Sequence, residues 1–212
     1  MKSTWRARLF WTAALLGFAV AGKIIANCAL PFPQVAPEQP VSNIKVLAAD
    51  DGGTVCQSCV DQASSRWNNA CGPGTKPTFV GMTESAEITA FVRFKAGGNP
   101  GSSRCKATKC ACAFVMTDPG TGRITMASVS IWQTAQGQNC AAHASDILTH
   151  EFAHILGIAD PPMDTCDGCT NIMGNVTGPI DSAVCDQVDR NFRTNQETAS
   201  IPINHPCHPQ FV

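Results

Sequence analysis

The segment that most constrains the fold is residues 147–160, which reads Ile-Leu-Thr-His-Glu-Phe-Ala-His-Ile-Leu-Gly-Ile-Ala-Asp. Its histidines, His150 and His154, stand four residues apart. On a helix of 3.6 residues per turn, this spacing places both imidazoles on one face, where a single metal ion can bind them together. The apolar residues around the histidines predict that the helix packs into a core. We therefore expect a buried helix that presents two metal ligands.

The residues beside and beyond this helix predict the rest of the metal site. Gly157 can adopt the left-handed conformation that ends a helix, and the resulting turn can bring Asp160 back towards the metal as a third ligand. Two histidines and a carboxylate, with a fourth position open, form a catalytic zinc site. Glu151 is expected to lie beside the ion and to take a proton from a metal-bound water. The alternative for Asp160 is a carboxylate that caps the loop before two prolines.

The helix motif is followed by a methionine in the segment Asn171-Ile-Met-Gly-Asn175. A His-Glu-x-x-His-x-x-Gly-x-x-Asp pattern with a downstream methionine resembles the metzincin zinc peptidases, in which a methionine-containing turn lies under the metal. The usual third ligand in those peptidases is histidine. Aspartate in that position is similar to the snapalysin-type peptidases, whereas the surrounding segment is similar to bacterial matrixin-like domains, so the subfamily stays open.

The resemblance implies roles for further residues. Met173 is expected to form the apolar floor beneath the metal and not to bind it. A strand at the edge of the sheet is expected to bind an extended protein or peptide substrate through main-chain hydrogen bonds, and residues 124–132 are the candidate. The chain contains no tyrosine, so the tyrosine that some metzincins place near the metal has no counterpart.

Periodicity and turn residues predict an α+β fold. The resemblance implies a metzincin-like zincin domain with a small mixed sheet, an active-site helix, a methionine turn and a C-terminal helix. We expect helices over 57–69 and from about 179–181 to 192, an active-site helix capped by Ser145 or Asp146, and strands over 88–95, 113–116 and 124–132.

The N-terminus has the features of an export signal. Three basic residues precede an apolar run over 9–21, which ends in Ala-Val-Ala. The run is shorter than the roughly 20 residues that a membrane helix needs. We therefore predict a signal peptide over 1–21 and a secreted, extracellular or periplasmic protein without stable membrane insertion of the mature chain. An uncleaved anchor, which would bury Lys23, is the alternative.

All twelve cysteines lie beyond this cut. An even number of cysteines in an exported chain indicates up to six disulfides, whose connectivity the sequence leaves open. The spacing of Cys56–Cys59 and of Cys166–Cys169 also fits zinc knuckles, which a reducing compartment would favour. If processing removes Cys28, one thiol is left over.

We divide the remaining chain into two parts. Residues 22–59, with four prolines between 31 and 40, are expected to form an extended N-terminal segment or a short pro-segment. Residues 60–212 are expected to form the zinc peptidase domain. Residues 1–21 carry three basic and no acidic side chains, so their removal changes the net charge from −1 to −4. This charge gives no argument for nucleic-acid binding, and we expect a monomer.

The function that these features predict is a secreted zinc endopeptidase. One alternative is a disulfide-stabilised extracellular metal-binding or interaction module without turnover, and another is a zinc hydrolase of non-peptide substrates. Glu151 favours an enzyme, because a site that only holds a metal has no need of a carboxylate at that position.

Overall fold

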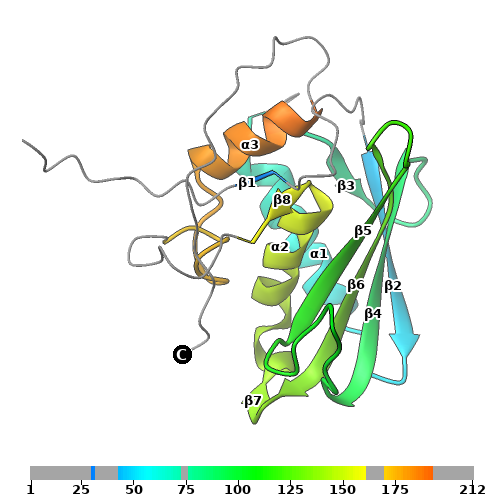
Figure 1. Cartoon of the computed structure of the whole chain (residues 1–212), viewed down its shortest axis with the longest axis vertical. Coiled ribbons are helices and arrows are strands. Elements are labelled where there is room, and N and C mark those ends of the chain that lie inside the picture. The colour runs from blue at the N-terminus through cyan, green and yellow to red at the C-terminus, as the bar shows by residue number, and fades with distance from the viewer. Residues whose placement is uncertain (1–29, 32–42, 73–75, 161–169, 193–212) are drawn as a thin grey trace, which may run out of the picture.

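A computed structural model describes residues 30–31, 43–72, 76–160 and 170–192, and the structural statements below concern these residues. They form an α+β fold in which a mixed sheet is covered on one face by helices (Figure 1). The α+β class, the mixed sheet and the disulfides predicted from the sequence are confirmed for this part of the chain.

The strands of the sheet lie in the order β3-β2-β4-β6-β5. Neighbours are parallel except for β5, which runs antiparallel to β6 and lies at one edge. A short strand, β7, also pairs with β6. The bounds are β2 Asn43–Asp51, β3 Thr78–Val80, β4 Ile88–Gly98, β5 Ala111–Thr117, β6 Ile124–Ala135 and β7 Gln138–Asn139.

Strand β4 shows why one face of the sheet holds the core. Ile88, Ala90 and Val92 are almost completely buried, whereas Arg93, which points to the other face, is exposed. Because successive side chains of a strand point to opposite faces, this alternation requires a layer packed on one side only.

Two helices form that layer. Helix α1 (Gln57–Ala70) packs against α2 (Ala144–Ile155), which follows a single 3₁₀ turn, η1 (Cys140–His143). Trp67 of α1 is fully buried and donates a hydrogen bond from Nε1 to the carbonyl oxygen of Thr149 in α2 at 2.7 Å. Phe79 stacks on Phe152 with ring centroids 4.8 Å apart. Helix α2 is therefore packed against both α1 and β3.

Two further elements lie beyond the end of α2. Strand β8 (Ile158–Ala159) pairs antiparallel with β1 (Leu30–Pro31). Helix α3 (Ser182–Phe192) buries Val184, Val188 and Phe192, the apolar residues whose spacing predicted it.

Four disulfides join the eight cysteines that the described residues contain. They are Cys56–Cys59, Cys71–Cys185, Cys105–Cys112 and Cys110–Cys140. The first of these rules out a zinc knuckle at Cys56–Cys59 in this structure. Cys28, Cys166, Cys169 and Cys207 lie outside the described residues, as does the predicted signal peptide over 1–21.

The predicted helices and the strands over 88–95, 113–116 and 124–132 are confirmed, with small differences at their ends. The expectation that residues 22–59 form an extended N-terminal segment is wrong for residues 43–51. These residues form β2, which lies between β3 and β4 in the sheet. Ile44 and Val46 of β2 are buried on the helix side. The nearby prolines and glycines indicate a loop, so the short alternation of buried and less buried residues in β2 was not recognised in the sequence.

Across the described residues, the helices lack the length and apolar character that spanning a membrane requires.

Candidate metal centre

The centre of the site is one turn of α2. His150, Glu151 and His154 are buried, and their ligand atoms lie within 4.8 Å of one another. The two imidazole rings lie edge to face with centroids 5.0 Å apart. These three side chains could hold a metal ion. The helix therefore places both histidines on one face, as their spacing predicts.

Two backbone carbonyls fix the orientation of the imidazoles. His150 Nδ1 lies 2.8 Å from the oxygen of Ile172, and His154 Nδ1 lies 2.7 Å from the oxygen of Ile158. A carbonyl oxygen can only accept, so each Nδ1 carries the hydrogen and donates it. In the neutral imidazole, the lone pair then lies on Nε2, which faces the site. Such outer contacts are typical of metal-binding histidines.

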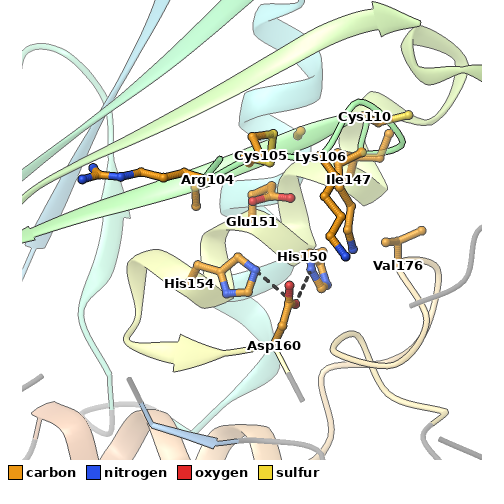
Figure 2. Close-up of a pocket in the computed structure, with 14 residues that line it drawn as sticks. Arg104, Cys105, Lys106, Cys110, Ile147, His150, Glu151, His154, Asp160 and Val176 are labelled. Carbon is orange, nitrogen blue, oxygen red and sulfur yellow. Dashed lines mark ion pairs between the residues drawn. A yellow bond between two sulfur atoms is a disulfide. The ribbon is translucent and has the colours of Figure 1, made fainter. Parts of the chain in front are cut away.

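Asp160 reaches the same point from the turn after α2. Gly157 has φ +77°, the left-handed conformation that favours glycine. The chain then passes through β8, and Asp160 Oδ1 comes to lie 3.3 Å from Nε2 of His150 and 3.3 Å from Nε2 of His154 (Figure 2). A tetrahedral ion with bonds of 2.0–2.1 Å separates its ligand atoms by about 3.3 Å. The spacing therefore fits a small four-coordinate cation.

While both imidazoles are neutral with Nε2 unprotonated, two buried oxygen atoms in this site have no hydrogen-bond donor among the described residues. They are Oε2 of Glu151 and Oδ1 of Asp160. Leaving a buried acceptor unsatisfied costs about 1–3 kcal/mol, and more for a charged group. A divalent cation between the three converging atoms, with a water beside Glu151, would satisfy both oxygens. The residues therefore fit a metal centre.

The ionisable side chains of the site strongly shift one another's pKa values. Burial by itself would lower the pKa of His154, but the carboxylates of Asp160 and Glu151 and the carbonyl of Ile158 together raise it to about 9. Burial would raise the pKa of Asp160, but the two imidazoles hold it well below its usual range. Without a metal, a proton on His154 would offset part of the negative charge of the two carboxylates. A metal ion would have to displace this proton.

The loop that contains Met173 orients the His150 side chain through a backbone carbonyl. Met173 is fully buried, and the preceding residue, Ile172, provides the carbonyl that orients His150. Asn171 shapes this loop: its Oδ1 accepts from the backbone N–H of Met173 at 3.1 Å, and its Nδ2 donates to Asp181 at 3.0 Å. The loop is thus part of the site's support, whereas the role of Met173 as a floor remains a prediction.

Helix α3 holds the turn that carries Asp160. The buried side chain of Asn191 donates from Nδ2 to the carbonyl oxygens of Leu156 at 2.8 Å and Gly157 at 3.1 Å. Gln187 fixes the amide of Asn191 by donating to its Oδ1 at 2.8 Å. These contacts satisfy the carbonyls that the end of α2 leaves open.

Arg66 of α1 ties the start of α2 to the loop after Met173. Its guanidinium donates to Asp146 at 2.6 Å and to the carbonyl oxygen of Gly178 at 3.1 Å. The predicted cap at Ser145 or Asp146 is wrong, because α2 begins at Ala144 after the 3₁₀ turn and Asp146 pairs with Arg66. The turn replaces the side-chain cap.

The site opens into a cleft of about 280 Å³ beside β5. Ala111, Cys112 and Ala113 of β5 form part of its wall. The expected edge strand over 124–132 is wrong, because β6 is paired with both β4 and β5. Among the described strands, the edge strand beside the site is β5. The family resemblance favoured 124–132 as the strand that precedes the metal helix, whereas the structure places this strand between two others.

The structure thus brings the four predicted site residues to one point. Sequence reasoning missed the supporting side chains Arg66, Asn171 and Asn191. Arg66 and Asn191 act across long separations along the chain, and neither has a local pattern that reveals its partner. No protein-family model matches the chain, and no curated protein matches it.

Proposed function

We propose that the chain is a zinc-dependent endopeptidase. The observation that carries this proposal is the convergence of two oriented Nε2 atoms, each 3.3 Å from one carboxylate oxygen of Asp160, beside the buried carboxylate of Glu151 and a cleft. A site that only stored a metal would need neither a second carboxylate that does not bind the metal nor access for a substrate.

The donor set supports zinc as the metal. Two imidazole nitrogens and one carboxylate oxygen are common ligands of catalytic Zn²⁺, which keeps a fourth position for water or substrate. Ca²⁺ and Mg²⁺ prefer six or more oxygen ligands. We therefore assign the ion to Zn²⁺, held by His150, His154 and Asp160.

Glu151 is the catalytic residue of the proposed mechanism. A bound zinc would polarise the scissile carbonyl and lower the pKa of the attacking water. Glu151 takes the proton of that water at Oε2 and then donates it to the nitrogen of the leaving amine. Because Glu151 is buried and Oε2 has no hydrogen-bond donor within the part of the chain that the structure describes, this oxygen is available for both steps.

The substrate that we propose is an extended protein or peptide. β5 ends the sheet beside the cleft, and an edge strand offers unpaired backbone N–H and C=O groups to an added strand. Such binding holds a chain on both sides of the scissile bond, which favours cleavage within a protein over trimming from its end.

We also propose that the protein works outside the reducing cytoplasm. Four disulfides support this location, because they persist in oxidising compartments. The predicted signal peptide over 1–21 would direct export.

The test is hydrolysis of casein by the purified protein. Activity that a zinc chelator abolishes and added zinc restores is expected for a zinc peptidase. A protein that binds zinc tightly but cleaves no protein or peptide would support the metal-binding module, and hydrolysis of esters or amides alone would support the non-peptide hydrolase.

A further inference from the structure

The wall of the cleft opposite α2 carries a cluster of positive charge. Residues 99–110 join β4 to β5, and we call them the cationic loop because they contain Arg104, Lys106 and Lys109. All three side chains line the cleft that holds the candidate metal centre. Arg104 and Lys106 are exposed, and Lys109 is half-buried. In Figure 2, Arg104 and Lys106 lie on opposite sides of Glu151.

The charge of the described part of the cleft is unbalanced. The acidic residues among its described lining are Glu151 and Asp160, and both belong to the metal centre. When a divalent metal offsets the charge of the two carboxylates, the charges of Arg104 and Lys106 are left as an excess of positive charge in this lining. The whole chain has a net charge of −1, so the positive charge is a local property of this wall.

The cationic loop is held in place by buried contacts. Asn99 is 8% exposed, and its Nδ2 donates to the carbonyl oxygens of Lys106 at 2.9 Å and Lys109 at 2.8 Å. The disulfides Cys105–Cys112 and Cys110–Cys140 join the loop to β5 and to the turn before α2. A fixed backbone reduces the entropy that the loop would lose when a ligand binds.

We propose that the cationic loop makes this cleft select peptides with acidic side chains next to the scissile bond. A carboxylate of the substrate would pair with Arg104 or Lys106 at the opening, and complementary charge of this kind provides specificity and faster association. The substrate class rests on the proposed peptidase function, but the selectivity in binding rests on the charges of the cleft alone.

Binding can be measured without turnover in the zinc-loaded Glu151→Gln variant of the full chain. Three fluorescein-labelled peptides of equal length are compared by anisotropy; they differ only in carrying Glu, Gln or Lys at two central positions. We expect the Glu peptide to bind at least about tenfold more tightly than the Lys peptide at low salt, a difference of about 1.4 kcal/mol. The ratio should approach one in 1 M salt, where the screening length is about 3 Å.

Charge reversal in the loop tests which residues are responsible. Adding Arg104→Glu and Lys106→Glu to the Glu151→Gln chain should abolish or invert the preference. Arg123→Glu is the matched control, because Arg123 is exposed in the turn between β5 and β6 and does not line the cleft. If the double variant does not fold, Lys106→Ala alone should still lower the ratio, while Arg123→Ala should not.

The outcomes separate this inference from the proposed function. Equal binding of the three peptides overturns the inference, as does a ratio that Arg123→Glu lowers as much as the double reversal. Cleavage of the Gln peptide by the wild-type chain would leave the proposed function intact in either case. Selective binding of the Glu peptide without cleavage of any peptide by wild type would overturn the peptidase function and keep the selectivity.

Discussion

Replacing Asn191 with alanine should loosen the turn that carries Asp160, although Asn191 is not part of the metal centre. Its side chain satisfies two carbonyl oxygens, those of Leu156 and Gly157, in a buried environment. Each buried acceptor that loses its partner costs about 1–3 kcal/mol. Water can reach part of the space left by the side chain, so we expect the free energy of unfolding to fall by about 2–4 kcal/mol.

The same substitution should weaken zinc binding. The turn at Gly157 brings Asp160 Oδ1 to within 3.3 Å of both histidines, and α3 holds this turn through Asn191. Loss of an outer contact that orients a ligand typically costs 10–100-fold in metal affinity. Because Asn191 acts through the turn and not on a ligand directly, we expect the lower end, about tenfold.

Two measurements test this reasoning: urea unfolding of the metal-free chain, and zinc affinity by competition with a chromophoric chelator. Asp186→Ala is a suitable control, since Asp186 is exposed on the same helix. The reasoning is refuted if Asn191→Ala loses stability but binds zinc as tightly as wild type. In that event the position of Asp160 does not depend on α3.

Three further predictions concern the charges and the disulfides. Asp160→Asn should leave the fold intact, because the side chain is 34% exposed, but should lower zinc affinity at least tenfold; unchanged affinity in the competition assay would place the third ligand elsewhere. The pKa of about 9 at His154 lies above the ordinary value of 6.5, so this histidine is protonated in the metal-free chain at neutral pH. Zinc should therefore release a proton on binding, and its affinity should rise between pH 6 and about pH 9; calorimetry in buffers of different ionisation enthalpy measures the release, and binding without it would contradict the assigned charges. Serine at Cys71 and Cys185, which are 114 residues apart, should cost about 5 kcal/mol of unfolding free energy on the chain-entropy account, against about 2 kcal/mol for the disulfide at Cys56–Cys59; equal losses in urea unfolding would show that loop length does not govern their contributions.

Local sequence patterns predicted much of the candidate metal centre. The spacing of His150 and His154 requires only helical geometry, and that helix is present. Gly157 marks the turn because its left-handed φ is a property of one residue. Asp160 follows this turn closely enough for the chain to return it to the histidines. Each of these inferences uses residues that lie close together in the sequence, within a stretch no longer than about four turns of helix.

The contacts that support the centre could not be predicted in this way. Arg66 meets Asp146 at a separation of 80 residues, and Asn191 meets Leu156 at a separation of 35. Either residue could equally lie on a solvated helix face when only its neighbours are known. The way in which the helices pack determines their partners, and the periodicity of the sequence does not reveal that packing.

The order of the strands in the sheet could not be predicted from the sequence either. The apolar residues over 124–132 indicate a strand, but they do not reveal whether it lies at an edge or inside the sheet. The structure places β6 between β4 and β5, which explains its apolar content. The basic residues of the cationic loop are visible in the sequence, but the sequence does not show which cleft they border.

The most direct test of the account is the Glu151→Gln variant, measured for zinc content and peptide hydrolysis together. Glutamine has the size of glutamate but cannot accept the proton, and Glu151 is not assigned as a metal ligand. We expect the variant to keep one zinc per chain while kcat falls by about 10²–10⁴-fold. A variant that keeps its zinc and cleaves peptides as fast as wild type would contradict the account.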